Sequence, residues 1–386
     1  MSNLRQLVIR YAKEIGFDLV AITGVEAFEK EEAITLERMK MGLMDGLPWY
    51  TESRVKRGCK PQELLPGAKS IISVAINYNI PPTKTLRPIE THGKVARYAW
   101  GDDYHKVLKK RLKEYIRGLS QKIGSSIKAK WYVDDGPMLD RAVAQRAGLG
   151  WYGKNTNILT PTHGSWVFLG QVITNLDLEP DAPSKKSCGE CVRCIDACPT
   201  GAIIAPYIID NTRCISYLTI EHSGPIPFHL RPLMQDWVFG CDICQDVCPV
   251  NIKAMYTKEQ AFQKRRFSIL ELVQLLEMTP EEFQEHFSNS PIKRTGLAGL
   301  QRNACVALGN TGSQEVVPTL VRAIQDGVPL VRGHAAWALG MVGGTLARLA
   351  LEEARDAESS PEVMTEIQSA LKTVGSRRSV SLPTVP

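Results

Sequence analysis

Eight of the ten cysteines in this chain lie between residues 188 and 248, and their spacing constrains the fold more than any other feature. The first run, "CGECVRCIDACPT" (188–200), reads Cys-x2-Cys-x2-Cys-x3-Cys-Pro. The second run, "CDICQDVCPV" (241–250), ends in the same way but has only three cysteines. In proteins with two cubane iron–sulfur clusters, the last cysteine of such a run, which precedes a proline, binds the other cluster. The spacing therefore predicts a small insert that folds around two [4Fe–4S] clusters.

The same crossing rule predicts which cysteines bind which cluster. The first cluster receives four ligands: Cys188, Cys191, Cys194 and Cys248. The second receives three: Cys198, Cys241 and Cys244. Cys214 is the candidate for the missing ligand because it precedes Cys241 by 27 residues, which leaves Cys59 and Cys305 outside both sets. Two zinc sites are the alternative, since zinc also binds four cysteines from CxxC pairs, but the interlocked Cys-Pro pattern favours clusters.

The regions on either side of the insert have different patterns. Residues 1–180 alternate helical and strand-like segments, with strands expected near 18–23, 69–78 and 165–175. Residues 129–137 are expected to form a strand that runs into a Gly-Pro turn. This alternation predicts an α/β or α+β domain built on a sheet. Residues 181–250 form the cysteine-rich insert, and residues 251–386 read as helical. We therefore expect three domains along the chain.

The helical region contains an internal repeat. "LQRNACVALGNTG" (300–312) matches "VRGHAAWALGMVG" (331–343) with an offset of 31 residues, the difference between positions 339 and 308. A helical repeat of this length is typical of a HEAT-like solenoid. Only two clear copies are visible, and an isolated pair is barely stable, so we expect the repeats to dock on the rest of the chain.

Composition places the chain among soluble proteins of the cytoplasm. It is 44% hydrophobic with a net charge of +6, and no apolar run reaches the roughly 20 residues that span a bilayer. The N-terminal stretch has neither a signal-peptide pattern nor a twin-arginine pair. In a reducing compartment, ten cysteines indicate metal or catalytic use and not disulfides.

A glycine-rich segment, "GLGWYGKN" (148–155), has the letters of a dinucleotide-binding motif and is nearly a P-loop. The dinucleotide motif must follow a strand, whereas the stretch before these glycines is helical. The P-loop also fails because Asn155 stands where a Ser or Thr should bind magnesium. We expect the glycines to end a helix and to let the polar loop "KNTN" (154–157) run close to a flat cofactor.

"YVDDGP" (132–137) carries the candidate acid. Asp134 and Asp135 follow an expected strand, and a carboxyl in an apolar pocket can hold a proton near neutral pH. The alternative is an exposed turn, because Asp-Asp-Gly-Pro is good turn chemistry. Basic residues occur in two further segments, and Arg97 among them could contact an anion or an amide-rich cofactor.

Taken together, these motifs resemble one family over the whole chain. "LLPGAKSII" (64–72), "RYAWGDDYHKVL" (97–108) and "VDDGPMLDRAVAQRAGLGWYGKNTNIL" (133–159), with the eight cysteines and the terminal repeat, are similar to epoxyqueuosine reductases. The resemblance implies an α+β chain with a nitroreductase-like cobalamin-binding domain over 1–180. A ferredoxin-like domain with two [4Fe–4S] clusters follows over 181–250, and HEAT-like repeats over 251–386.

The resemblance also implies an activity and a set of site residues. The family reduces the epoxide of epoxyqueuosine to the alkene of queuosine at the wobble position of tRNA, the last step of queuosine biosynthesis, using cob(I)alamin fed by the two clusters. It makes Asp134 the proton donor and Asp135 the turn residue. Expected cobalamin contacts, some matched to the family and others proposed as neighbours of the ring, are Arg57, Arg97, Asp134, Arg141, Ile158, Ser216 and Asp242.

The expected partners are tRNA and an external electron donor, with no membrane and a monomeric enzyme. Binding tRNA needs phosphate contacts from basic side chains. Candidates near or within the helical region are Lys264, Arg265, Arg266, Lys293, Arg294 and Arg302. One alternative is a corrinoid reductive dehalogenase, which usually carries a twin-arginine signal and lacks the repeat. The other is a two-cluster electron-transfer protein, which would need neither the first domain nor the repeat.

Overall fold

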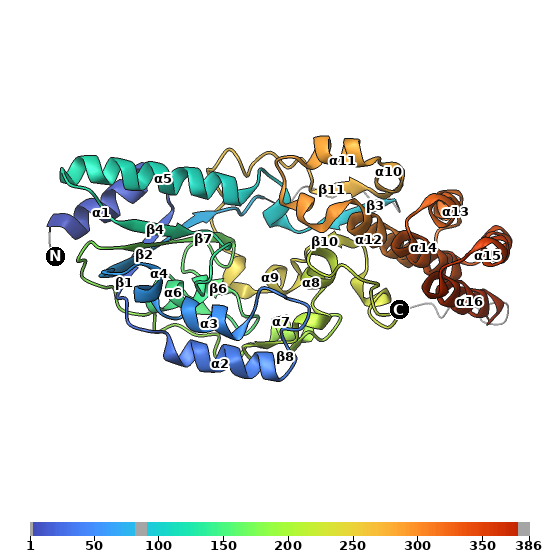
Figure 1. Ribbon diagram of the computed structural model, residues 1–386, viewed down its shortest axis with the longest axis horizontal. Coiled ribbons are helices and arrows are strands. Elements are labelled where there is room, and N and C mark those ends of the chain that lie inside the picture. The colour runs from blue at the N-terminus through green and yellow to red at the C-terminus, as the bar shows by residue number, and fades with distance from the viewer. Residues whose placement is uncertain (1–2, 82–90, 377–386) are drawn as a thin grey trace. The chain divides into compact units, whose positions relative to one another are not determined.

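The computed structural model describes residues 3–81 and 91–376, and these residues form two compact units (Figure 1). Unit 1 draws on the ranges Met1–Pro82, Trp100–Cys214 and Asp242–Arg266. Unit 2 draws on Thr83–Ala99, Ile215–Cys241 and Phe267–Pro386. Both units are therefore discontinuous in sequence, and the three-domain division along the chain stays a prediction. None of the described helices is long and apolar enough to cross a membrane.

Unit 1 is built on a four-stranded antiparallel sheet with the order β1-β2-β7-β4. The strands are β1 (Leu19–Thr23), β2 (Ser70–Asn77), β4 (Ala129–Tyr132) and β7 (Val167–Thr174). Every residue of β2 is buried, as its continuous apolar run predicts for a strand covered on both faces. All four predicted strands are confirmed, and β4 ends at Tyr132, ahead of the Asp-Asp-Gly-Pro segment.

Helices cover both faces of this sheet (Figure 1). The helices α1 (Asn3–Glu14) and α5 (Tyr104–Ile123) pack on each other and on one face. On the opposite side lie α2 (Glu29–Lys40), α3 (Glu52–Gly58), α4 (Pro61–Leu64) and α6 (Asp140–Arg146). Asp103 caps α5 by accepting a hydrogen bond from the amide of His105 (3.0 Å), and Gly124 ends the helix with φ +73°.

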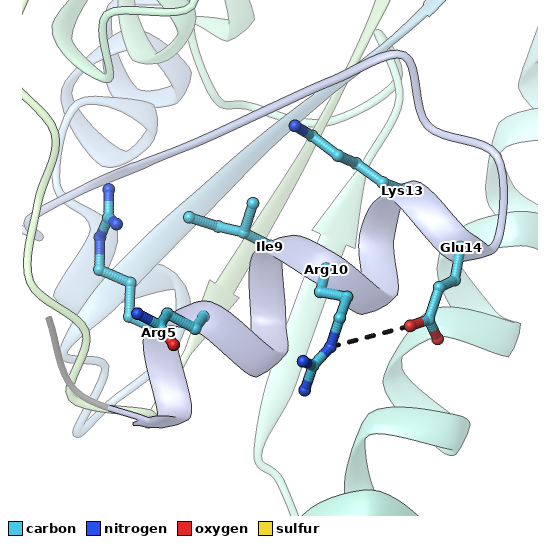
Figure 2. A pocket seen from close by; sticks show the side chains of 6 residues that line it. Arg5, Ile9, Arg10, Lys13 and Glu14 are labelled. Carbon is cyan, nitrogen blue, oxygen red and sulfur yellow. Dashed lines mark ion pairs between the residues drawn. The ribbon is translucent and has the colours of Figure 1, made fainter.

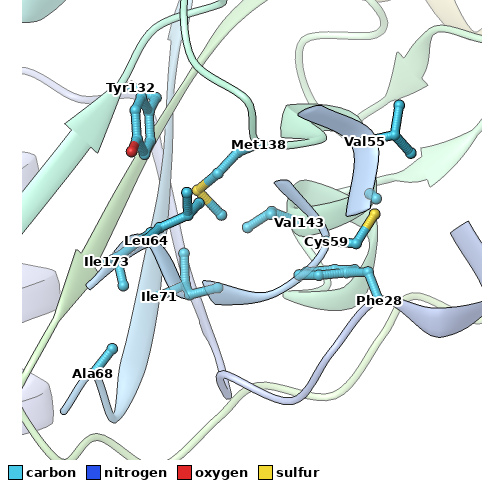
Figure 3. Close-up of a cluster of buried hydrophobic side chains, with 11 residues drawn as sticks. Phe28, Val55, Cys59, Leu64, Ala68, Ile71, Tyr132, Met138, Val143 and Ile173 are labelled. Atoms are coloured by element: carbon cyan, nitrogen blue, oxygen red, sulfur yellow. The ribbon is translucent and has the colours of Figure 1, made fainter. Parts of the chain in front are cut away.

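A cluster of buried side chains connects α2, α3, α4, α6 and the sheet (Figure 3). Its members are Phe28, Val55, Cys59, Leu64, Ala68, Ile71, Tyr132, Met138, Ala142, Val143 and Ile173. Tyr132 immediately precedes the Val133–Pro137 segment, and Met138 immediately follows it. Both ends of that segment are therefore anchored in the core, and only the residues between them can carry a functional group to the surface.

The cysteine runs of unit 1 fold into short elements. Each run forms a one-turn helix ahead of its Cys-Pro pair, α7 (Arg193–Asp196) or α9 (Ile243–Asp246), and these two helices contact each other. The remaining elements are β5 (Trp151–Tyr152), β6 (Ile158–Leu159), β8 (Ile203–Ala205), β9 (Ile208–Ile209), η2 (Asn211–Arg213) and η4 (Pro249–Asn251). A domain that folds around metal clusters instead of a hydrophobic core is expected to have only short helices and strands such as these.

Unit 2 combines a small sheet with a stack of helices. The sheet has the order β10-β3-β11, formed by Trp237–Phe239, His92–Val95 and Ile269–Glu271. Around it lie the short elements η1 (Arg97–Ala99), α8 (Ile215–Ile220), η3 (Pro232–Met234), α10 (Leu272–Glu277), α11 (Pro280–Phe287) and η5 (Pro291–Thr295). Thr279 and Glu282 form a capping box at the start of α11.

The predicted repeat forms the helical stack. Its helices are α12 (Gly296–Thr311), η6 (Gln314–Val316), α13 (Val317–Asp326), α14 (Pro329–Val342), α15 (Thr345–Ala357) and α16 (Pro361–Ser376). The helices α12, α14 and α16 pack side by side, with α13 and α15 against them. A Cβ on Gly309 would lie 2.9 Å from Cα of Ala338, and one on Gly340 would lie 2.9 Å from Cα of Ala370. The repeated glycine therefore permits close helix contact.

The stack is joined to the 215–240 segment of unit 2 by buried polar side chains. The guanidinium of Arg302, which is 0% exposed, donates to the carbonyls of Leu218 (2.7 Å), His222 (2.6 Å) and Gly224 (2.8 Å). Asn303 Nδ2 donates to the carbonyls of Thr219 and Val238, both at 2.9 Å. The expected docking of the repeats is confirmed within unit 2. The prediction that Arg302 contacts RNA phosphate is wrong, because its donors are used inside the protein.

We expect Glu366→Gln to destabilise the protein by about 3 kcal/mol, the lower end of the cost of breaking a buried ion pair. Glu366 accepts two hydrogen bonds from Arg231, at 2.8 and 2.6 Å, and Arg231 is 1% exposed. Removing the carboxylate leaves a buried guanidinium without its counter-charge. Glu352→Gln is the matched control, because Glu352 pairs with Arg348 on a largely exposed helix face. Urea unfolding measures both variants, and equal midpoints would contradict the prediction.

Candidate active site

Asp134 lies directly after β4 with its side chain exposed. Its backbone has φ +54°, the left-handed region that aspartate and asparagine adopt more readily than other residues with a Cβ. The hydroxyl of Tyr104 donates a 2.8 Å hydrogen bond to Oδ2 of Asp134. No other described residue bonds to this carboxyl. One oxygen of Asp134 is therefore fixed by the protein, and the other is available to a substrate.

Neighbouring contacts fix the backbone of the loop that carries Asp134. The Asp135 carboxylate pairs with Lys109 and accepts a hydrogen bond from the amide of Val133 (3.0 Å). Arg54 donates to the carbonyl of Gly136 at 2.6 Å. A Cβ on Gly58 would lie 1.9 Å from the carbonyl oxygen of Pro137, so α3 packs directly on this loop. We call residues 133–137 the acid loop.

The two adjacent aspartates thus have different environments. Partial burial raises the pKa of Asp135, but hydrogen bonds from Lys109 and Val133 outweigh this and leave the pKa below its ordinary value. Asp135 is therefore an ionised carboxylate that stabilises the loop. The turn interpretation fits Asp135, while Asp134 is the residue that presents its carboxyl.

A third acid, Asp140, begins α6 and was not singled out from the sequence. Its Oδ1 is buried and has no hydrogen-bond partner among the described residues. Burial raises the pKa of Asp140 well above its ordinary value, and the charges of Asp134 and Asp135 raise it further. No signal in the sequence marks Asp140, because an acidic residue in the first turn of a helix is common.

Arg141 follows on α6 and connects this helix to the polar loop 154–157. It is exposed, and its Nη1 donates to the carbonyl (2.8 Å) and Oγ1 (3.2 Å) of Thr156, whose φ is +68°. Ile158 follows the loop and is 4% exposed in the core, so it can offer only backbone atoms to a ligand. The helix before Gly148 is confirmed, and the dinucleotide and P-loop interpretations fail as expected.

The other predicted contact residues are divided between the two units. Arg57 is exposed on α3, the helix that packs on the acid loop. Asp242, 2% exposed, belongs to unit 1 and accepts a 3.2 Å hydrogen bond from Gln245. Arg97 begins η1 and Ser216 lies on α8, both in unit 2. Within unit 1, Arg57, Asp134 and Arg141 thus lie on elements that meet at the acid loop.

The four cysteines predicted for the first cluster lie within electrostatic range of one another. Burial raises the pKa of Cys194, and the charges of Cys188, Cys248 and Cys191 raise it further. Cys248 packs with Trp151 and Leu159, and Cys188 lies against the same cluster. Four thiols that share one small region are a donor set suited to a cubane cluster.

The residues predicted for the second cluster are divided between the two units. Unit 1 contains Cys198, Cys214 and Cys244, and the chain leaves it after Cys214. It returns after Cys241, the last residue of that segment of unit 2. Cys198 contacts Thr200, and the carbonyl of Cys244 accepts a hydrogen bond from Asn155 (3.3 Å). Asn155 therefore connects the polar loop 154–157 to the second cysteine run.

The basic residues predicted to contact RNA have varied surroundings. Lys264 and Arg266 pair with Asp102 in unit 1, and Arg265 donates to the carbonyl of Pro81. In unit 2, Lys293 is exposed and Arg294 pairs with Glu221 at 2.6 Å. These five remain candidates for phosphate contact.

Two surface hollows lie away from the acid loop. One, of about 610 Å³, is lined only by residues of α1 (Figure 2). Its labelled side chains include Arg10 and Glu14, which pair with each other across one helical turn. The second, of about 390 Å³, is lined by residues of β1, the segment after α6, and residues 161–162 and 181–182. Neither contains Asp134 or a cysteine, so neither is the candidate active site.

Three family models match separate parts of the chain. The model described as "Epoxyqueuosine reductase QueG, DUF1730" matches residues 59–135. A 4Fe-4S double cluster binding domain matches residues 187–251, and HEAT repeats match residues 298–372. The second match decides between iron–sulfur clusters and zinc in favour of two [4Fe–4S] clusters. Together with the structure, the matches confirm the predicted α+β architecture with terminal helical repeats.

Similar proteins cover nearly the whole chain. An epoxyqueuosine reductase from Bacillus cereus is 37% identical over 98% of this chain and 99% of its own length. A crystal structure of epoxyqueuosine reductase with a tRNA-Tyr epoxyqueuosine-modified stem loop has 35% identity and a TM-score of 0.90, covering 97% of this chain and 100% of that one. A Bacillus subtilis structure, in which the Asp134 catalytic loop is swung out of the active site, has 34% identity and a TM-score of 0.90, covering 96% and 100%.

Proposed function

The chain belongs to the epoxyqueuosine reductase family, and we propose that it reduces the epoxide of epoxyqueuosine to the alkene of queuosine at the wobble position of tRNA, the last step of queuosine biosynthesis. The observation that carries this proposal is similarity over nearly the full length, including to a relative solved with an epoxyqueuosine-modified stem loop. The other two functional classes considered, a dehalogenase and a simple electron carrier, have no comparable support.

The reaction defines what the protein must supply. Converting an epoxide to an alkene takes two electrons and two protons and releases the oxygen as water. Two [4Fe–4S] clusters deliver electrons one at a time, so we infer an external one-electron donor protein. The departing oxygen needs a proton, and a positioned carboxylic acid is suited to provide it.

Asp134 is our candidate for the proton donor. Its carboxyl is exposed on the acid loop with one oxygen held by Tyr104. The Bacillus subtilis relative is described as having an Asp134 catalytic loop, which supports this assignment. Asp135 is excluded from the role by its ion pair with Lys109, which keeps it ionised.

We propose that the eight cysteines are divided between the two clusters as the spacing predicts. The first is bound by Cys188, Cys191, Cys194 and Cys248, and the second by Cys198, Cys214, Cys241 and Cys244. The electrostatic proximity of the first four thiols supports the first set. Chain spacing assigns Cys248, from the second run, to the first cluster. Its packing near Cys188 is consistent with this assignment.

We propose that cobalamin is the cofactor and that it binds at the acid loop. A corrin ring carries amide side chains around its rim, and the exposed guanidinium groups of Arg57 and Arg141 are donors suited to amide oxygens. Further contacts would come from Asp134, backbone atoms near Ile158, and Arg97, Ser216 and Asp242. When bound, the cobalt supplies a strongly reducing and nucleophilic centre. The protein contributes binding, orientation and the proton.

The proposed substrate is a tRNA, which the chain would bind as a monomer in the cytoplasm. Phosphate contacts would come from Lys264, Arg265, Arg266, Lys293 and Arg294, and such contacts weaken as salt rises. Chemistry on a base requires that the base leave its stack. The modified nucleoside would therefore reach the acid loop in an extruded conformation.

The proposal is tested by reconstituting the protein with iron, sulfide and cobalamin and assaying tRNA that carries epoxyqueuosine, with a chemical reductant as electron source. We expect digested tRNA to contain queuosine, identified by nucleoside mass spectrometry. The optical spectrum establishes that clusters and corrinoid are bound. A fully loaded protein that leaves epoxyqueuosine unchanged would overturn the proposed function, and release of halide from a halogenated phenol would favour the dehalogenase.

A further inference from the structure

Among the described residues, the hydroxyl of Tyr104 is the group that donates a hydrogen bond to the Asp134 side chain. Its 2.8 Å hydrogen bond ends on Oδ2 and leaves Oδ1 without a partner among the described residues. A carboxyl oxygen that accepts a hydrogen bond from a phenol is a poor place for the acidic proton of the same carboxyl. The proton of a neutral Asp134 is therefore directed to Oδ1, the oxygen that Tyr104 does not contact.

Tyr104 is itself held rigidly in unit 1. Its ring is 9% exposed and stacks on Phe168 of β7, with ring centres 4.3 Å apart and planes 2° from parallel. On the other side it stacks with His105 at 4.0 Å. The residue begins α5, where Asp103 caps the helix. Its hydroxyl therefore has a fixed position relative to the central sheet.

Asp134, in contrast, depends on contacts for its conformation. Tyr132 and Met138 anchor the two ends of the loop in the core (Figure 3), and Asp135 and Gly136 are held by Lys109 and Arg54. A left-handed backbone at a residue with a Cβ costs roughly 1–2 kcal/mol. The Tyr104 hydrogen bond is of a size comparable with this cost, because a typical hydrogen bond within a protein contributes about 0.5–1.5 kcal/mol.

We propose that Tyr104 is a positioning residue for the proton donor: its hydroxyl holds Oδ2 of Asp134, keeps the acid loop in its observed conformation and directs the transferable proton to Oδ1. The inference rests on the proposed function, because it assumes that Asp134 protonates the epoxide oxygen. Tyr104 makes no transfer itself. Its phenol keeps its proton, and the proton that leaves with the oxygen comes from Asp134.

The test replaces Tyr104 with Phe, which keeps the ring and its stacking and removes only the hydroxyl. We expect kcat to fall by about 10- to 100-fold with KM for tRNA unchanged, because misplacing a catalytic group by about 1 Å can cost 100-fold. Tyr115→Phe is the matched control. Tyr115 lies on the same helix, is 0% exposed and donates to the carbonyl of Val8 at 2.9 Å, so its loss removes a comparable buried bond far from Asp134.

A second arm asks whether Tyr104 acts through Asp134. In an Asp134→Asn background, Tyr104→Phe should cause no further fall in kcat, because residues that act as a unit are strongly non-additive. A fall of the same size in both backgrounds would overturn the proposal, as would a Tyr104→Phe variant with kcat within about twofold of wild type.

A third arm measures no turnover. In the reconstituted protein, hydrogen exchange of peptides covering 133–137 should quicken in Tyr104→Phe and remain unchanged in Tyr115→Phe. Unchanged exchange in both variants would contradict the role of Tyr104 in fixing the loop. If wild type formed no queuosine, the proposed function would fail while this arm still decided the positioning role.

Discussion

Replacing Cys214 with Ala should remove one cluster and leave the other. Iron content should fall from about eight to about four atoms per chain, because each cubane holds four irons and the variant lacks one of the four ligands of the second cluster. The first cluster keeps all of its proposed ligands and should still give a [4Fe–4S] signal in electron paramagnetic resonance of the reduced protein. Turnover of epoxyqueuosine should be lost with any electron donor that must pass electrons through both clusters.

The prediction is sharp because Cys214 is the ligand that the two cysteine runs do not supply. It lies at the end of η2, separated from Cys241 by a segment that belongs to unit 2. If the second cluster used a ligand from elsewhere, such as a carboxylate or water, Cys214→Ala would keep about eight irons. That result would remove Cys214 from the proposed set and leave the first cluster unaffected.

Cys59→Ala is the control for this experiment. Cys59 is 0% exposed and packs among apolar side chains (Figure 3), and burial raises the pKa of its thiol to about 12. Such a thiol behaves as a small hydrophobic group and not as a ligand. Its removal should cost some stability and no iron. If this variant also lost iron, the fall in iron content would reflect general unfolding of the chain and not the loss of a ligand.

Features that depend on local sequence were the ones that could be predicted. The four strands of unit 1 are visible in the sequence as apolar runs, and β4 ends at Tyr132, ahead of the turn residues Asp-Asp-Gly-Pro. The cysteine spacing was read correctly as a double-cluster domain because metal geometry restricts spacing more strongly than side-chain packing does.

The third copy of the helical repeat was missed for a simple reason. Leu371 in α16 follows Leu339 by 32 residues, one more than the offset of the first two copies, and Lys372 replaces the glycine of the motif. A fixed period cannot detect a copy with one inserted residue. The matched HEAT repeats, which extend to residue 372, include it.

Contacts between distant residues account for what the sequence could not show. Arg302 has the basic side chain expected of an RNA contact, but it is buried. Its hydrogen-bond partners are backbone carbonyls that lie 78 to 84 positions away in the sequence. The Tyr104–Asp134 bond joins residues 30 positions apart. No periodic pattern marks either one. Basic or aromatic character alone therefore could not separate surface residues from those that hold the fold.

Replacing Asp134 with Asn should reduce turnover by about 100- to 10,000-fold, the usual contribution of a general acid. The amide has no acidic proton, but it is nearly the same size and tolerates the left-handed backbone that Asp134 adopts at φ +54°. Its carbonyl oxygen can still accept the hydrogen bond from Tyr104. The substitution therefore removes the proton and keeps the shape, which Asp134→Ala would not do.

Asp135→Asn provides the matched control one residue away. Its amide oxygen can still accept the hydrogen bond from the amide of Val133, so the loop keeps that contact and loses only the ion pair with Lys109 on a partly exposed surface. We therefore expect a change in turnover of less than about threefold and a small loss of stability. Queuosine formation is measured for both variants after optical spectra have established equal cluster and cobalamin content. If Asp134→Asn kept near-wild-type turnover, the proton would have to come from another group, and the buried acid Asp140 would be the next residue to replace.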